Sequence, residues 1–245
     1  MDDFDHNHAE DEIQRLHKAL DRASAEFEEF VSTAAHNLRE SLREVASYSQ
    51  LIAETYAGRL DSDAGIFLKH IQEGAARMQS LLTGMVDYSA AGTGERSSSR
   101  TDMEAVLCQA LLCTDKQIVE RGVIVTHDPL PQVRGDFGIL TKVLHHLIRN
   151  AIEFCEAPSP RVHISCRREG PEWVFSVQDN GPGIEIEFQG RLFGAFKRLH
   201  GKEHPGNGLG LAFCKKAIGW QGGRMWMEST PGAGSTFYFS QPPVD

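Results

Sequence analysis

Residues 173–184 read WVFSVQDNGPGI, an alternating run of mostly apolar residues that leads directly into a carboxylate, an amide and two glycines. The alternation predicts a β-strand with one buried face. Asp179 follows the apolar part of the strand, so we expect its carboxylate at a strand end, facing a cleft. Gly181 and Gly183 have no side chain, and their backbone can approach a ligand closely.

Outward from this strand, residues 102–242 alternate between short strands and helices. Strand-like segments are GVIVTHD, LPQVRGD, RVHISCRR, GRMWMES and GSTFYFS, which begin at residues 122, 130, 161, 223 and 234. Helical patterns cover 103–120 and 209–221, and a third helix is expected to run from a cap at Asp136 to about Phe154. The mixture predicts an α/β fold in which helices cover one face of a sheet.

Residues 13–90 have a different pattern, with apolar residues three or four apart. It predicts one helix over about 12–56 and a second, antiparallel helix whose apolar face includes Phe67, Ile71 and Met78. The turn is AGRLDSDAG, with Asp61 or Ser62 as N-cap. The stripe of the first helix comprises Ile13, Leu16, Leu20, Ala23, Phe27, Phe30, Ala34, Leu38, Leu42, Val45, Tyr48 and Ile52.

A hairpin with two long apolar stripes cannot bury both alone. We therefore expect a second copy and a four-helix bundle. The alternative is that the stripe packs on the second domain. The expected organisation is an acidic tail over 1–12, the hairpin over 13–90, a polar linker over 91–101 and the α/β domain over 102–242.

Composition excludes several classes of protein. The 245 residues are 40% hydrophobic and 24% charged, which is ordinary for a globular protein. A net charge of -9 argues against general binding of nucleic acid or of anionic membranes. No apolar run approaches the ~20 residues of a membrane span. Five cysteines without tight pairs fit a reducing compartment, so we expect a cytoplasmic protein.

Two further segments of the α/β region carry polar or glycine-rich motifs. HHLIRNAIEF (145–154) places Asn150 late in a helix, and GNGLGL (206–211) opens another helix. Each is weak alone, because glycines often mark a turn and a helical Asn is often at the surface. Together with Asp179 they suggest a nucleotide pocket. A carboxylate can accept from an adenine amine, a helix start can bind phosphate, and an amide oxygen can ligate Mg²⁺.

The order of these motifs resembles the N, G1, F and G2 boxes of the histidine-kinase ATPase domain, whose Bergerat-type ATP-binding fold is shared with the gyrase and Hsp90 ATPases. The F box would be LFGAFKRLH (192–200), and residues 197–239 are especially similar to phytochrome-type histidine kinases. The resemblance implies Mg²⁺ ligands at His146 and Asn150. It implies ATP-binding residues at Asn150, Asp179, Gly181, Gly183, Ile184, Phe193, Lys197, Arg198, Gly206, Asn207, Gly208, Leu209, Gly210 and Leu211.

The same resemblance gives a role to AAHNLRESLREV (34–45), which is similar to the phosphoacceptor box of a dimerisation helix. His36 takes the acceptor position, and Asn37, Arg39 and Glu40 complete the implied catalytic set. At ~100° per residue, His36 lies about 200° from Ala34, so its ring should point away from the apolar seam. The alternative is that His36 is simply a surface histidine.

The implied activity is that of a homodimeric histidine kinase in two-component signalling. His36 would take a phosphoryl group from Mg-ATP and pass it to an Asp of a response-regulator receiver domain. A sensor protein or a fused segment would supply the signal, and neither nucleic acid nor membrane is an expected partner.

Four positions depart from the family pattern: Asn37 replaces an acid, Ser41 a proline, His146 an asparagine and Glu153 a lysine. Proton removal by a general base typically raises a reaction rate about 10²–10⁴-fold, so the loss of the acid is compatible with slow autophosphorylation. The cations Lys197, Arg198 and Lys202 could offset the charge of Glu153, in a segment (185–205) that we expect to be a lid.

The departures also support a second hypothesis, a degenerate kinase that binds a receiver domain or a partner kinase with little ATP turnover. A third hypothesis, an ATPase of the gyrase or Hsp90 type, is disfavoured by the histidine-bearing hairpin.

Overall fold

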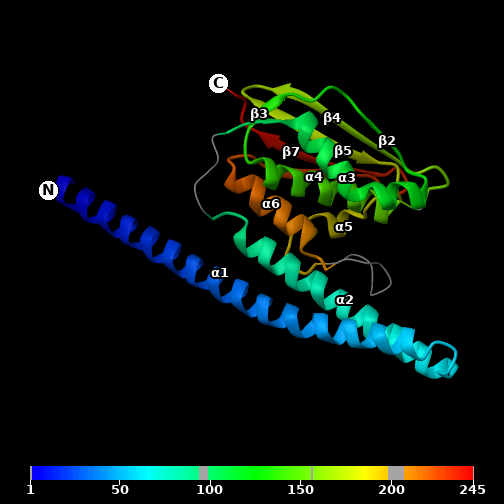
Figure 1. Ribbon diagram of the computed structural model, residues 1–245. Helices are drawn as coiled ribbons and strands as arrows, with labels where there is room; N and C mark the ends of the chain where they lie inside the picture. Colours follow the sequence, from blue (N-terminus) through cyan, green and yellow to red (C-terminus); the bar gives the residue numbers. More distant parts are fainter. Residues whose placement is uncertain (1, 94–98, 156, 198–206, 245) are drawn as a thin grey trace. The chain divides into compact units, whose positions relative to one another are not determined.

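The computed structural model describes residues 2–93, 99–155, 157–197 and 207–244. The chain divides into two compact units, residues 1–90 and 91–245. Figure 1 shows a pair of long helices in the first unit and a helix-covered sheet in the second. A helical region followed by a mixed α/β region is the predicted fold class.

The first unit is an antiparallel hairpin of α1 (Asp2–Thr55) and α2 (Ser62–Ala90). The Asp61 side chain accepts a hydrogen bond from the amide of Ala64 at 2.8 Å, which confirms Asp61 as the cap of α2. The first helix, which we expected over about 12–56, begins earlier, at Asp2, and ends at Thr55. Neither Pro nor Gly interrupts residues 2–12, and their acidic side chains favour a helix N-terminus.

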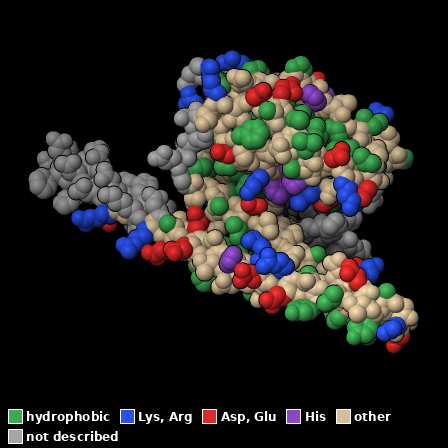
Figure 2. All heavy atoms as spheres, in the orientation of Figure 1, with side chains coloured by type: hydrophobic (Ala, Val, Ile, Leu, Met, Phe, Trp, Pro, Cys, Tyr) green, Lys and Arg blue, Asp and Glu red, His purple; other side chains and the backbone are tan. Residues whose placement is uncertain are grey.

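Among the side chains that the structure describes in the hairpin, few apolar ones are buried. Val31 and Ala35 on α1, and Ala75 and Leu82 on α2, are buried. Much of the predicted stripe is instead exposed in the single chain, at Phe27, Phe30, Leu38, Val45, Tyr48 and Ile52 of α1 and at Phe67, Ile71, Met78 and Met85 of α2. In its described part, the hairpin thus keeps apolar side chains that its own two helices do not cover, and hydrophobic side chains are visible at its surface in Figure 2.

The second unit contains a five-stranded sheet of order β2-β4-β5-β7-β6. Its strands are β2 (Ile124–His127), β4 (Arg161–Glu169), β5 (Glu172–Asp179), β6 (Met225–Ser229) and β7 (Ser235–Gln241). β2 pairs with β4 in parallel, and the other neighbours are antiparallel. A small second sheet pairs β1 (Arg100–Asp102) with β3 (Gln132–Arg134).

Three helices, α3 (Met103–Arg121), α4 (Phe137–Glu153) and α6 (Gly210–Trp220), lie on one face of the large sheet (Figure 1). The core between the two layers includes Phe175, Phe239, Leu140, Leu144, Leu147, Ile148, Ile164 and Ile218, all fully buried. Helix α4, which carries HHLIRNAIEF, is fixed at both ends. Asp136 accepts from the amide of Ile139 at 2.8 Å, as predicted, and Arg121 donates to the carbonyl oxygens of Ile152 and Glu153 at 3.0 Å.

Two expectations about connecting segments need correction. The linker predicted over 91–101 ends inside β1, where Thr101 is buried and donates to the carbonyl of Gly135 at 2.6 Å. The segment expected to be an irregular lid begins with a short helix, α5 (Ile186–Gln189). Lys202 lies outside the described residues. Within the described part of the chain, no helix combines the length and apolarity that a bilayer crossing needs.

Candidate functional site

Asp179 is the last residue of β5. Its Oδ1 accepts hydrogen bonds from the backbone amides of Gly181 at 2.8 Å and Ser235 at 3.2 Å. Burial raises the pKa of this carboxyl above its ordinary value, against the opposing effect of the two hydrogen bonds. Both bonds fall on one oxygen, and the described residues donate none to Oδ2. The side chain is therefore a fixed, half-buried acceptor, as recognition of an amine requires.

The glycines of DNGPGI are required by close packing. A Cβ on Gly181 would lie 2.9 Å from Oδ1 of Asp179. Gly183 has φ +71°, and a Cβ there would overlap the carbonyl oxygen of Thr230. The first glycine thus lets the chain turn back over the carboxylate, and the second lets it lie directly against the loop between β6 and β7.

The hairpin of β6 and β7 holds the DNGPGI loop in place, and the sequence analysis did not predict this support. Ser229 accepts from the amide of Ile184 at 2.8 Å and donates to the carbonyl of Gly234 at 2.9 Å. The side-chain amide of Gln189 donates to the carbonyls of Ile184 at 2.8 Å and Ser229 at 3.1 Å. The Gly-rich TPGAG at 230–234 is typical of a turn, but nothing in the sequence says which loop that turn contacts.

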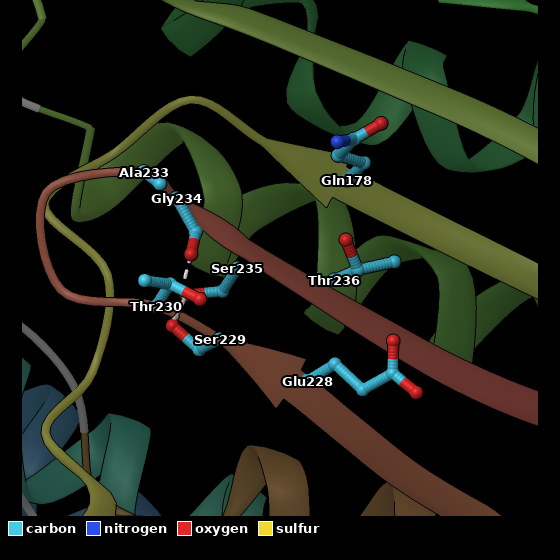
Figure 3. Close-up of a pocket in the computed structure, with 8 residues that line it drawn as sticks. All are labelled: Gln178, Glu228, Ser229, Thr230, Ala233, Gly234, Ser235 and Thr236. Carbon is cyan, nitrogen blue, oxygen red and sulfur yellow. Dashed lines mark hydrogen bonds between the residues drawn. The ribbon is translucent and has the colours of Figure 1, made fainter.

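The same hairpin contributes to a cavity of about 160 Å³ that contains none of the predicted site residues (Figure 3). It is lined by Gln178, Glu228, Ser229, Thr230, Ala233, Gly234, Ser235 and Thr236. Gln178 and Asp179 are successive residues of a strand, so their side chains point to opposite faces of the sheet. The cavity thus lies behind the Asp179 site, on the face away from the helices.

On α4, His146 and Asn150 are half-buried and one turn apart. The His146 ring packs edge-on against Phe213 of α6, with 5.4 Å between centroids, and a Cβ on Gly210 would lie 3.1 Å from its Nδ1. The guanidinium Nη2 of Arg149 lies 3.4 Å from the same Nδ1. Burial, and then the charge of Arg149, lower the pKa of His146 to about 3.

This environment does not fit a magnesium ligand at His146. Mg²⁺ prefers oxygen ligands, and a guanidinium beside Nδ1 repels a second cation. The amide oxygen of Asn150 has the right chemistry, so we keep only that residue as a candidate. Among the described residues, no group of three or more His, Cys, Asp or Glu side chains could hold a metal ion.

The GNGLGL segment leads into α6. Gly208 has φ +71°, and its carbonyl accepts from the amide of Phe196 at 2.9 Å. The Asn207 side chain accepts from the amide of Leu209 at 3.0 Å, and Leu209 is buried. Phe193, Lys197, Gly210 and Leu211 complete the described part of this predicted set: Lys197 is exposed and the others are half-buried. Arg198 and Gly206 lie outside the described residues.

On α1, the His36 side chain is 68% exposed, as the helical geometry predicted. Its Nε2 lies 3.6 Å from Oε1 of Glu40, one turn further along the helix. Asn37 and Arg39 are exposed, and the Asn37 carbonyl accepts from the hydroxyl of Ser41 at 3.4 Å. Glu40 is therefore the carboxylate that the described structure places beside the imidazole.

Comparison with known proteins assigns most of the second unit to a family. Residues 135–245 match the family model described as histidine kinase-, DNA gyrase B-, and HSP90-like ATPase. These residues belong to that family. The chain as a whole is homologous to phytochrome-type and other sensor histidine kinases.

Relatives of the whole chain include cyanobacterial phytochrome A of Nostoc sp., 42% identical over 95% of this chain and 30% of its own length. Phytochrome-like protein Cph1 of Synechocystis sp. is 39% identical over 95% of this chain and 31% of its own length. The chain thus spans about a third of these relatives.

Solved structures agree with the fold. Full-length ShkA, in complex with AMPPNP, matches with a TM-score of 0.69 and 26% identity over 87% of this chain and 45% of its own. The Acinetobacter baumannii histidine kinase AdeS matches with a TM-score of 0.58 and 19% identity over 84% of this chain and 97% of its own. The AdeS comparison supports the fold alone.

Proposed function

We propose that this chain is the kinase module of a two-component system, which transfers the γ-phosphoryl group of ATP to His36 and then to an Asp of a response regulator. The observation that carries the proposal is the Asp179 site, where a half-buried carboxylate keeps one oxygen free of described donors beside a loop that only glycine can form. The AMPPNP complex of ShkA supports ATP as the ligand.

The residues of the second unit would hold the nucleotide. Asp179 would accept a hydrogen bond from the exocyclic amine of adenine, and the backbone of Gly181 and Gly183 would lie along the base. The amides at the start of α6 would face the phosphates, because they have no partners within the helix. Asn150 would hold Mg²⁺, which when bound neutralises phosphate charge.

His36 of the hairpin would be the nucleophile. A ring nitrogen forms a bond to the γ-phosphorus as the bond from that phosphorus to the bridging oxygen breaks, and ADP leaves with the electron pair. The ring proton passes to a base. The amide of Asn37 cannot accept that proton, whereas Glu40, at 3.6 Å, can. The exposed apolar stripe of α1 and α2 supports a homodimer formed through the hairpin.

The proposal is tested by incubating the full chain with Mg²⁺ and γ-radiolabelled ATP. We expect an acid-labile label on the wild type, no label on His36→Ala and little on Asn150→Ala. His70→Ala is the matched control, because His70 is an exposed histidine of α2 with a neighbouring glutamate. A label that survives in His36→Ala would overturn the acceptor assignment.

The second candidate is a degenerate kinase that acts by binding a receiver domain or another kinase. Asn37 and Glu153 favour it, since one removes the usual base and the other places a carboxylate on the helix of Asn150. Calorimetry separates the two: tight binding of a receiver domain with undetectable ATP binding decides for the degenerate kinase, and ATP binding followed by labelling decides against it.

A further inference from the structure

Arg149 is a half-buried cation on the same helix as Asn150. Its side chain is 26% exposed, and that of Glu153, one turn further on, is 12% exposed. The Nε of Arg149 lies 3.7 Å from Oε1 of Glu153. The pair therefore shares one face of α4, and its charges cancel locally.

The guanidinium has unused donors. Nε is buried and has no hydrogen-bond partner among the described residues, because its distance to Glu153 is too long for a hydrogen bond. Nη2 reaches only a marginal contact of 3.4 Å with Nδ1 of His146. A guanidinium offers five N–H groups in a planar fork that matches phosphate oxygens. Nε faces Glu153, and among the described residues the Nη groups have only this marginal contact, so the Nη donors are the ones that can bind oxygen atoms of a ligand.

The position of Arg149 points to the phosphates. Its neighbour His146 lies against Gly210, the first residue of α6, where a Cβ would be only 3.1 Å from the ring nitrogen. The amides of the first turn of α6 have no acceptors within the helix and attract anions. Arg149 and the start of α6 therefore both lie beside Nδ1 of the same imidazole.

We propose that Arg149 is a cation that binds the ATP phosphates in this chain, one turn before the position where the family pattern places a lysine and this sequence has Glu153. Glu153 holds the guanidinium by its Nε side, so that the two Nη groups face the ligand. The inference rests on the proposed function, since it assigns a residue to the same nucleotide site.

The test is calorimetric binding of ATP, ADP and adenosine to the full chain. We expect Arg149→Met to weaken ATP and ADP binding about tenfold or more while adenosine changes less than about twofold. Arg149→Lys should retain most of the ATP affinity. In Arg149→Met/Glu153→Lys, which moves the cation one turn along α4, ATP affinity should recover.

The matched control is Arg167→Ala, which removes an exposed arginine from the sheet face away from α4, where it stacks on Tyr238. It should leave binding of all three ligands unchanged. If Arg149→Met weakens adenosine binding as much as ATP binding, or leaves both unchanged, Arg149 does not bind the phosphates. If the wild type binds no nucleotide at all, the proposed function itself fails. Thermal unfolding of each variant shows whether it is folded. If Arg149→Met is not folded, Arg149→Gln, which removes the charge but keeps a polar side chain, carries the test with the same expected result.

Discussion

The two units of this chain bury their apolar residues very differently. In the second unit, large side chains such as Phe175, Phe239 and Leu144 are fully buried between sheet and helices. In the hairpin, Phe27 is 61% and Phe30 69% exposed. The second unit therefore has a core of its own and carries the nucleotide-site residues on it. The hairpin carries His36 on helices that need a further apolar surface, so nucleotide binding should belong to one unit and acceptor chemistry to the other.

The largest effect should come from the core of the second unit. Phe239→Ala removes a fully buried ring that stacks on Phe175, with 5.0 Å between centroids. We expect it to lower the free energy of unfolding of that unit by about 3–5 kcal/mol, measured by denaturant titration. The matched change Phe193→Ala, at a half-buried phenylalanine, should lower the free energy of unfolding by clearly less. Equal costs would contradict the packing described for this unit.

The next largest effect should be on nucleotide affinity, and it should arise from a substitution in the second unit but not from one in the hairpin. Asp179→Ala removes the acceptor of two backbone amides and of the proposed adenine contact. We expect ATP and adenosine affinities to fall about 100-fold, or about 3 kcal/mol by calorimetry. His36→Ala should leave both affinities unchanged. Glu228→Gln, in the cavity behind the site, is the control on the opposite sheet face. Weaker binding of ATP or adenosine by His36→Ala would contradict the assignment of nucleotide binding to the second unit alone.

The stability of the second unit against unfolding should also depend on pH. The pKa of His146 is lowered to about 3 in the folded state, and the unfolded chain has the ordinary value of 6.5. The unfolded state therefore binds more protons between these values, so stability that is complete above pH 6.5 is lost as the pH falls toward 3. We expect His146→Asn to remove about 2–4 kcal/mol of this dependence. An unchanged pH profile of unfolding would show that His146 is not held neutral.

The smallest effect concerns the exposed stripe. Phe30→Ser should raise the dissociation constant of the proposed dimer at least about tenfold, measured by analytical ultracentrifugation, because each copy loses an apolar ring from the interface. Glu29→Ser, at the neighbouring exposed position, should have no such effect. If the wild type sediments as a monomer at all concentrations, the stripe is covered by something other than a second copy.

Sequence patterns predicted most of this architecture because the relevant physics is local. The helical period and the caps at Asp61 and Asp136 depend on residues within one turn, and both caps are confirmed. The strand order is different, because pairing β2 in parallel with β4 joins distant residues. The support of the DNGPGI loop by Ser229 and the packing of His146 against Gly210 are also long-range contacts, so motif reading could name His146 but not its surroundings.

The central claim is that the imidazole of His36 receives the phosphoryl group from ATP bound in the second unit. The most direct measurement is mass spectrometry of the full chain after incubation with Mg-ATP, digested at neutral pH so that a phosphoramidate survives. The account predicts one phosphoryl group, located on His36 and absent from Asp179→Ala. A phosphoryl group on any other residue, or none on a protein that binds ATP, would contradict it.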